Sequence, residues 1–190
     1  MPKTAFLPAL LPALLPVLFL AATLGSAASA ADFRLTSTSI AEGAQLAPDA
    51  VFAGFGCEGG NRSPDLAWTG APEGTKSFAI TAYDPDAPTG SGWWHWNVVN
   101  IPASVTGLDA GAGSGGEMPA GAVALKNDYG SAGFGGACPP PGEVHRYIFT
   151  VHALSAEKLD LPENASNALA GFMIGASTIA TARITAVYNR

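Results

Sequence analysis

Glycine and proline interrupt this 190-residue chain so often that they limit which regular elements it can form. The sequence holds 23 glycines and 15 prolines, whereas only 13% of its residues are charged. Both residues favour turns, and proline also removes a backbone donor, so this composition favours many short strands over long surface helices. The expected fold class is mainly β.

An apolar run from Leu7 to Leu24 follows Lys3 and ends in the small-residue triplet 28–30. This order is typical of a secretory signal with its cleavage site, and the prolines within the run disfavour a continuous membrane-spanning helix. We therefore expect residues 1–30 to be a cleaved signal peptide and residues 31–190 to form one exported domain, periplasmic or secreted. Stable membrane insertion after cleavage is not expected.

The charge of the chain argues against a nucleic-acid partner. The full sequence has nine basic and fifteen acidic side chains. Removal of the signal takes Lys3 with it and leaves a net charge of −7 with the histidines neutral. Nucleic-acid binding depends on neutralising phosphates with basic side chains, which this balance disfavours.

Cys57 and Cys138 are the two cysteines of the chain. In an exported protein an even count usually indicates a bridge, so we expect one disulfide. The chain-entropy model assigns such a bridge roughly 4 kcal/mol, because it closes a loop of about 80 residues. Two buried thiols remain the alternative.

Short segments rich in β-branched and aromatic residues alternate with turn signals, and we predict them as strands. They are Phe33–Ser37, Leu66–Trp68, Phe78–Tyr83, His95–Ile101, Arg146–Leu154 and Ile184–Tyr188. Strand alternation predicts three sets of side chains, each of which points to one side of its strand and includes an ionisable residue at the strand end. They are Phe78, Ile80, Ala82 and Asp84; His95, Asn97 and Val99; and His145, Tyr147, Phe149 and Val151. Arg146 and His152 fall opposite His145, and we assign them no ligand role.

A C-terminal helix is predicted to start at Ser166 or Asn167. Its apolar residues recur at helical spacing, and we interpret the face that they form as core. They are Leu169, Phe172, Met173, Ala176, Ile179 and Ala180. A shorter helix is predicted over Ser155–Leu159, and the Gly- and Ala-rich stretch Ala110–Gly121 is interpreted as a mobile loop.

Three segments carry the chemistry. Residues 83–88 interleave two carboxylates with two prolines after an apolar strand, and this stiff turn would hold Asp84 in place. Residues 93–97 gather three of the four tryptophans around His95. The third segment is a Gly- and Pro-rich loop, 135–142, just before His145. We expect the backbone N–H groups of Gly136, Ala137 and Cys138 to line an anion pocket.

Asp84 beside either histidine would favour the imidazolium and raise that histidine's pKa. Two protonated histidines can then hold an anion. The residues do not determine whether Asp84 orients one ring or accepts a donor from the ligand.

These motifs resemble the phosphatidylethanolamine-binding protein family, in its bacterial Raf kinase inhibitor-like branch. They are Asp-Pro-Asp-Ala-Pro at 84–88, Trp-His-Trp-Asn-Val-Val-Asn at 94–100, and Gly-Gly-Ala-Cys-Pro-Pro followed by His-Arg-Tyr between 135 and 147. The resemblance implies packed antiparallel sheets and a surface pocket for phosphate-like anions or lipid head groups. The implied ligand-binding residues are Asp84, Trp93, His95, Gly136, Cys138, Pro139, Pro140, His145 and Tyr147.

The resemblance also implies a cis peptide bond at Ala87-Pro88, and Pro88 is taken as structural. Asp86 faces away from Asp84 by alternation, and we interpret it as structural too. The chain departs from the family pattern at Ala137, where proline is common, and in the short 142–144 spacer before His145. Both departures alter the rim of the pocket.

We therefore expect a binding protein for a small anion, without a cofactor and with no identified protein partner, which acts as a modulator of another protein. Three alternatives remain open. A carboxylate and two histidines can also perform acid/base hydrolysis of an ester or phosphoester, and they are a common ligand set for zinc or iron. Inhibition of a protease or kinase would follow only from what some members of the family do.

Overall fold

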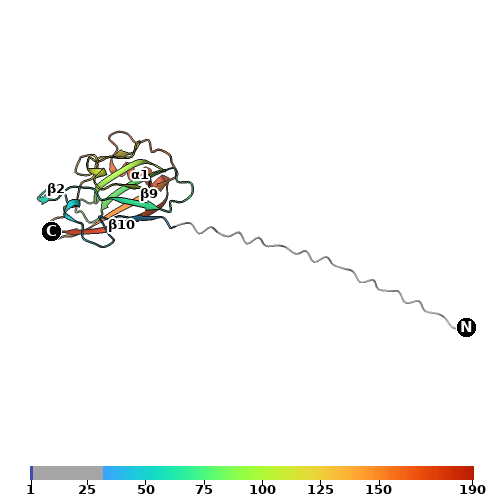
Figure 1. Cartoon of the computed structure of the whole chain (residues 1–190), viewed down its shortest axis with the longest axis horizontal. Coiled ribbons are helices and arrows are strands. Elements are labelled where there is room, and N and C mark those ends of the chain that lie inside the picture. Colours follow the sequence, from blue (N-terminus) through green and yellow to red (C-terminus); the bar gives the residue numbers. More distant parts are fainter. Residues whose placement is uncertain (2–31) are drawn as a thin grey trace.

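The computed structural model of the chain describes Met1 and residues 32–190 (Figure 1). The expected signal peptide, apart from Met1, lies outside the described residues. Within residues 32–190, no helix combines the length and apolar character needed to cross a bilayer.

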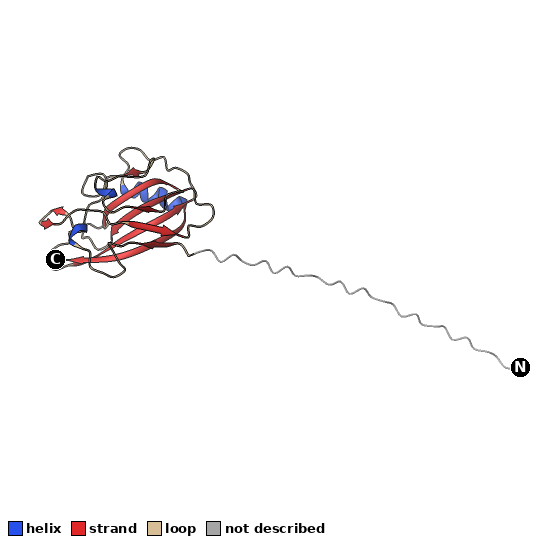
Figure 2. Ribbon diagram, viewed as in Figure 1, coloured by secondary structure: helices blue, strands red, loops and turns tan. Residues whose placement is uncertain are grey.

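Antiparallel strands dominate the described chain, with α1 as its α-helix (Figure 2). This confirms the predicted fold class. The strands are β1 (Arg34–Thr36), β2 (Ala53–Gly54), β3 (Cys57–Glu58), β4 (Leu66–Thr69), β5 (Ser77–Asp84), β6 (Trp93–Pro102), β7 (Gly107–Leu108), β8 (Val123–Ala124), β9 (Val144–Leu154) and β10 (Thr178–Asn189). The helix α1 covers Asn167–Ser177, and two 3-10 turns cover Pro48–Ala50 and Ala112–Ser114.

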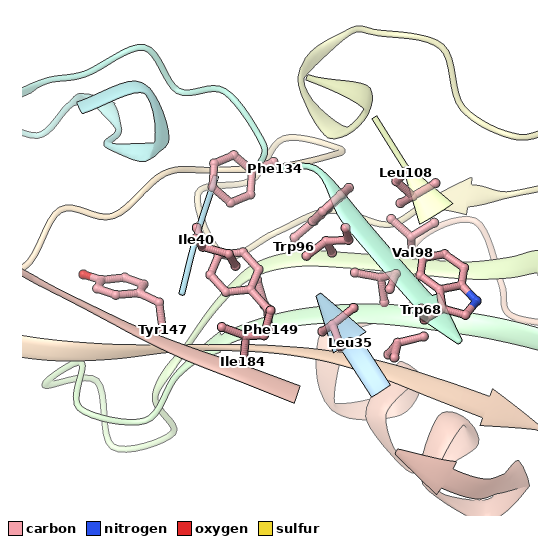
Figure 3. Packing of buried hydrophobic residues seen from close by; sticks show 14 of the residues in the cluster. Leu35, Ile40, Trp68, Trp96, Val98, Leu108, Phe134, Tyr147, Phe149 and Ile184 are labelled. Atoms are coloured by element: carbon pink, nitrogen blue, oxygen red, sulfur yellow. The ribbon is translucent and has the colours of Figure 1, made fainter. Parts of the chain in front are cut away.

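The main sheet has five strands in the order β10-β9-β5-β6-β8, and a smaller sheet has the order β1-β4-β7. All strand pairs within both sheets are antiparallel. The largest apolar cluster includes Leu35 and Trp68 from the smaller sheet, together with Trp96 and Phe149 from the main sheet (Figure 3). The two sheets therefore pack face to face around one core, which is the arrangement expected of two amphipathic layers.

The central strand β5 is buried on both faces. Phe78, Ile80 and Ala82 belong to the core between the sheets, as strand alternation predicts. Ala79 belongs to a second cluster that includes Ala170 and Ile174 of α1. The helix therefore covers the outer face of the main sheet.

The helix presents a different face to the sheet from the one predicted. Its buried residues are Asn167, Ala170 and Ile174, whereas the side chain of Phe172 is 72% exposed. The prediction of a core face through Leu169 and Phe172 was wrong, because the helix approaches the sheet through Ala170 and Ile174 rather than its bulkier residues. The helix also ends at Ser177, so the predicted positions Ile179 and Ala180 belong to β10.

One further local prediction failed, and the predicted loop at Ala110–Gly121 contains a packed turn. Residues Ser155–Leu159 form no helix, because the Leu159 N–H donates to the Asn100 side chain at 2.7 Å rather than to a preceding carbonyl. The stretch Ala110–Gly121 is packed onto the core through the 3-10 turn that contains Gly113. A Cβ on Gly113 would lie 2.5 Å from the Trp96 ring, so a glycine is needed for this close approach.

Candidate functional site

The sheet topology brings Asp84, His95 and His145 together. Asp84 is the last residue of β5, whereas His95 and His145 lie near the starts of β6 and β9. Since β5 is antiparallel to both neighbours, its end lies beside their beginnings. The three side chains therefore meet at one end of the main sheet, and all are almost fully buried.

A bulge in β6 turns His95 toward this site. The register between β5 and β6 shifts where Ala82 pairs with Trp96 and Tyr83 pairs with Trp94, which leaves His95 as the extra residue. The predicted common face of His95, Asn97 and Val99 was therefore wrong: Val99 packs in the cluster under α1, whereas His95 faces Asp84. A β-bulge redirects a side chain in this way.

Asp84 is the centre of the polar network. Its Oδ2 accepts a hydrogen bond from His145 Nδ1 at 2.7 Å, and its Oδ1 accepts from the N–H groups of Asp86 and Ala87 at 2.8 and 3.1 Å. Burial raises the pKa of this carboxyl, but the two histidines and the backbone donor outweigh that effect and hold its pKa below the ordinary value. Asp84 is therefore an ionised carboxylate that both caps the turn and orients His145.

His145 is held between two carboxylates. Its Nδ1 donates to Asp84, and its Nε2 donates to Glu143 Oε2 at 3.0 Å. Burial lowers the pKa of His145, but the hydrogen bonds to Glu143 and Asp84 more than compensate and raise it above the ordinary value. Asp84 thus pairs with His145 as an imidazolium, whereas the sequence left open which histidine it would choose.

His95 has a different environment. Its Nδ1 lies 2.7 Å from the Gly135 carbonyl, which assigns the Nδ1–H to that bond. Its Nε2 lies 4.0 Å from Asp84 Oδ2 and has no hydrogen-bond partner within the described chain, although it is buried. The Tyr147 hydroxyl and Trp93 Nε1 are likewise buried without a partner. Buried polar atoms are rarely left unpaired, and these are three of the six such side-chain atoms in the described chain.

These three atoms belong to residues that line one pocket of about 370 Å³. Figure 3 shows Tyr147 at one end of the core cluster, with its hydroxyl pointing away from the other labelled side chains. The predicted ligand-binding residues that line the pocket are Asp84, Trp93, His95, Cys138, Pro140, His145 and Tyr147. Pro88, predicted as structural, also lines it, whereas Gly136 and Pro139 do not.

The prediction of backbone anion donors was wrong for two of the three groups. The Gly136 N–H donates to Asn61 Oδ1 at 2.7 Å, and the Ala137 N–H donates to the Ala50 carbonyl at 3.0 Å. A Cβ on Gly136 would lie 2.4 Å from the Val51 carbonyl carbon. Gly136 therefore permits close packing of the 135–142 loop against residues 50–52, and its donor is already used.

Sequence reasoning missed the aromatic wall of the pocket. The Tyr129 ring stacks on Phe52 at a centroid distance of 3.9 Å and meets the edges of Trp93 and His95 at 5.1 and 5.7 Å. Its hydroxyl donates to the Gly136 carbonyl at 3.0 Å. The available signal was an aromatic residue within a turn segment, Asn-Asp-Tyr-Gly at 127–130, where exposed polar side chains are the norm.

A disulfide and a set of hydrogen bonds from Arg190 hold the other wall of the pocket. Cys57 and Cys138 form a disulfide, which confirms the bridge that the cysteine count predicted. Arg190, also missed from the sequence, donates from Nε to the Pro139 carbonyl at 2.6 Å and from Nη1 to the Gly56 carbonyl at 2.8 Å. Both links join residues 55–57 to residues 138–139. The remaining unpredicted lining residues are Phe55, Ala87, Thr89 and Pro141.

The turn at 85–88 is fixed from both sides. Asp86 forms an ion pair with Arg146 at 2.7 Å and also accepts the Arg146 backbone N–H at 2.9 Å. The hydrogen bond and charge of Arg146 lower the pKa of Asp86 to about 2. Within the described residues all peptide bonds are trans, so the expected cis bond at Ala87-Pro88 was wrong. The Asp84 side chain caps the turn in this trans form.

His152 lies on the face opposite His145, as alternation predicted. It contacts Thr81 Oγ1 at 3.2 Å, and burial lowers its pKa to about 4. Within residues 32–190, no three His, Cys, Asp or Glu side chains are grouped so that they could hold a metal ion. His145 already uses both ring nitrogens, so the arrangement does not favour the metal alternative.

The two histidines His145 and His152 are expected to respond to pH in opposite directions. The folded pKa of His145 lies above its ordinary 6.5, so its stabilising contribution is full below pH 6.5 and is lost as pH rises through the raised pKa. The folded pKa of His152 is about 4, so its contribution is present above pH 6.5 and is lost as pH falls toward 4. Titration of the ring resonances by NMR tests this, and two transitions near 6.5 would contradict it.

Comparison with known proteins adds independent information. The family model described as phosphatidylethanolamine-binding protein matches residues 36–189. The chain is 61% identical over 165 residues to UPF0098 protein YbcL of Escherichia coli K12, covering 85% of this chain and 90% of that protein. It is 52% identical over 157 residues to UPF0098 protein YbhB of the same strain, covering 82% and 99%.

A solved structure agrees with these matches. The crystal structure of E. coli YbcL, described as a new member of the mammalian PEBP family, superposes with a TM-score of 0.82 at 60% identity and covers 84% of this chain and 99% of that one. The family match at residues 36–189 covers α1, strands β2 to β10 and the pocket residues other than Arg190. The chain therefore belongs to the phosphatidylethanolamine-binding protein family.

Proposed function

We propose that this protein binds a small oxyanion, free phosphate or a phosphate-containing head group, in the pocket between Asp84 and Tyr147. The observation that carries the proposal is the set of three buried, unpartnered polar atoms on residues of one pocket: His95 Nε2, Tyr147 Oη and Trp93 Nε1. A tetrahedral oxyanion has enough oxygens to pair with all three. Such pairing would remove the free-energy cost of leaving them unsatisfied.

The chemistry of each group suits a phosphate. Trp93 Nε1 is a donor only, and the Tyr147 hydroxyl can donate or accept. His95 Nε2 can accept from a protonated phosphate oxygen or, once protonated, donate to an ionised one. His145 and Arg190 line the same pocket, where their positive charges offset the negative charge of Asp84.

Hydrolysis is less well supported by the same residues. The acid/base candidates Asp84 and His145 are paired with each other, and the second ring nitrogen of His145 is bonded to Glu143. Among the lining residues, Cys138 is in the disulfide and the Thr89 hydroxyl donates to the Gly92 carbonyl. Neither Cys138 nor Thr89 is therefore free to act as the nucleophile beside a base, as nucleophilic catalysis would require.

Titration with inorganic phosphate, followed by the histidine ring resonances, tests the proposal. We expect the His95 signal to shift while the His152 signal, on the opposite face of the sheet, does not. His95→Ala should weaken binding by about tenfold or more, because a hydrogen bond to a charged group contributes about 1.5–3 kcal/mol. A second arm with glycerophosphoethanolamine distinguishes a head group from free phosphate. An unchanged His95 signal at saturating concentrations of both ligands would contradict the proposal.

We also infer that the protein is exported. A 35% identical relative over 138 residues is named a putative lipoprotein of Mycobacterium tuberculosis, and the Cys57–Cys138 disulfide suits an oxidising compartment. The N-terminal pattern in residues 1–30 supports the same inference. Mass determination of the protein after expression from its full sequence should give a chain that begins near Ala31.

A further inference from the structure

Glu143 has a position that the proposed function does not explain. It directly precedes β9, and its Oε2 accepts a hydrogen bond from His145 Nε2 at 3.0 Å. The side chain of Glu143 is 51% exposed, whereas that of His145 is only 3% exposed. The half-exposed carboxylate of Glu143 therefore accepts one N–H of the buried His145 imidazolium, which lines the pocket.

The two carboxylates on His145 are held very differently. Asp84 is buried, and its second oxygen accepts two backbone N–H groups, so it cannot leave without stranding several donors. Within residues 32–190, His145 is the one ionic partner of Glu143. The Nε2 side of the imidazolium is therefore the side that a ligand can reach by displacing a protein group.

Backbone hydrogen bonds fix the position of the main chain at Glu143. The Glu143 N–H donates to the Pro140 carbonyl at 3.2 Å, and the Gly142 N–H donates to the Arg190 carbonyl at 2.7 Å. Gly142 has a φ of +85°, which suits glycine in this turn after the proline run. The main chain is thus held, and release of His145 needs only rotation of the Glu143 side chain.

We propose that Glu143 is an internal competitor for the anion position at His145. In the empty pocket its carboxylate pairs with His145 Nε2, and an oxyanion that binds there must displace it. This rests on the proposed function and goes beyond it, because Glu143 then sets the affinity threshold of the pocket. A ligand must offer more acceptors than Glu143 does, by reaching His95 and Tyr147 as well.

Phosphate affinity of Glu143→Gln tests this. Glutamine keeps the shape of the side chain and an acceptor for the His145 Nε2–H, but it removes the negative charge and with it the ion pair. We expect Glu143→Gln to bind inorganic phosphate about fivefold more tightly than the wild type, the size expected for loss of a partly exposed ion pair. Glu143→Ala, which removes the acceptor, should bind at least as tightly.

Glu157→Gln is the matched control, because Glu157 is exposed and, unlike Glu143, forms no ion pair with a pocket residue. It removes the same charge and should leave phosphate affinity unchanged. All titrations are made at pH 6, below the ordinary pKa of histidine, so that His145 stays protonated in every variant. Thermal unfolding of each variant checks that the fold is retained.

The outcomes separate the two proposals. If the wild type binds phosphate and Glu143→Gln binds equally or more weakly, the competitor role is overturned while the proposed function stands. An equal gain in Glu157→Gln would also overturn it, because the effect would then be one of net charge. If neither the wild type nor any variant binds phosphate, both proposals fail.

Discussion

Asp84→Ala is expected to lower the free energy of unfolding by about 3–5 kcal/mol, the cost typical of removing one partner from a buried ion pair. The substitution would leave the His145 imidazolium buried beside Glu143 alone, and it would strand the N–H groups of Asp86 and Ala87. Urea denaturation at pH 6 measures the change. Phosphate binding should be lost as well, since His145 would no longer be oriented.

Asp86→Ala provides the control for this prediction. Asp86 lies two residues away and pairs with Arg146, whose side chain is 57% exposed. Because this pair is partly exposed, the variant should lose less stability than Asp84→Ala, about 1–2 kcal/mol for the ion pair and the backbone hydrogen bond together. If both variants lose the same free energy of unfolding, burial of the Asp84–His145 pair does not determine how much that pair stabilises the fold.

Removal of the disulfide is expected to have an effect of similar size. Cys57 and Cys138 are separated by 81 positions, and a bridge closing a loop of that length contributes about 4 kcal/mol in the chain-entropy model. The double variant Cys57→Ala/Cys138→Ala should show this loss in urea denaturation. Binding should also weaken, because Cys138 lines the pocket and its loop would then be held by Arg190 without the covalent link.

Addition of a reductant separates the bridge from the change in side chains. The wild type should lose about as much stability under reductant as the double variant loses by substitution, whereas the double variant itself should be insensitive to it. Wild-type stability that does not change once free thiols have been detected would contradict the prediction.

Much of the site was predictable because its motifs lie at strand ends. Asp84 and His145 follow from alternation along their own strands, and antiparallel pairing brings the end of β5 to the starts of its neighbours. The disulfide followed from an even cysteine count. Tyr129 and Arg190 were missed because neither belongs to one of the three motifs, although Tyr129 closely precedes the 135–142 loop.

The direction of His95 and the buried face of α1 needed the structure. Simple alternation places His95 with Asn97 and Val99, but one extra residue in β6 moves its ring to the side of Asp84. Likewise, helical spacing predicted that Leu169 and Phe172 would pack in the core, whereas Ala170 and Ile174 are the apolar residues of α1 that are buried against the sheet. In both cases a local pattern has two solutions, and packing against a neighbour selects one.

The sequence by itself determined the class of fold, the family resemblance, the bridge and the residue types that gather around Asp84. These depend on local properties, namely turn propensity, strand alternation and motif order. The tertiary structure alone decided that Asp84 pairs with His145 and that Glu143 accepts the second N–H of the same ring. It also decided that the N–H groups of Gly136 and Ala137 donate to Asn61 and Ala50 rather than to a ligand. Those outcomes depend on distances between strands and loops far apart in the chain, which a local pattern does not contain.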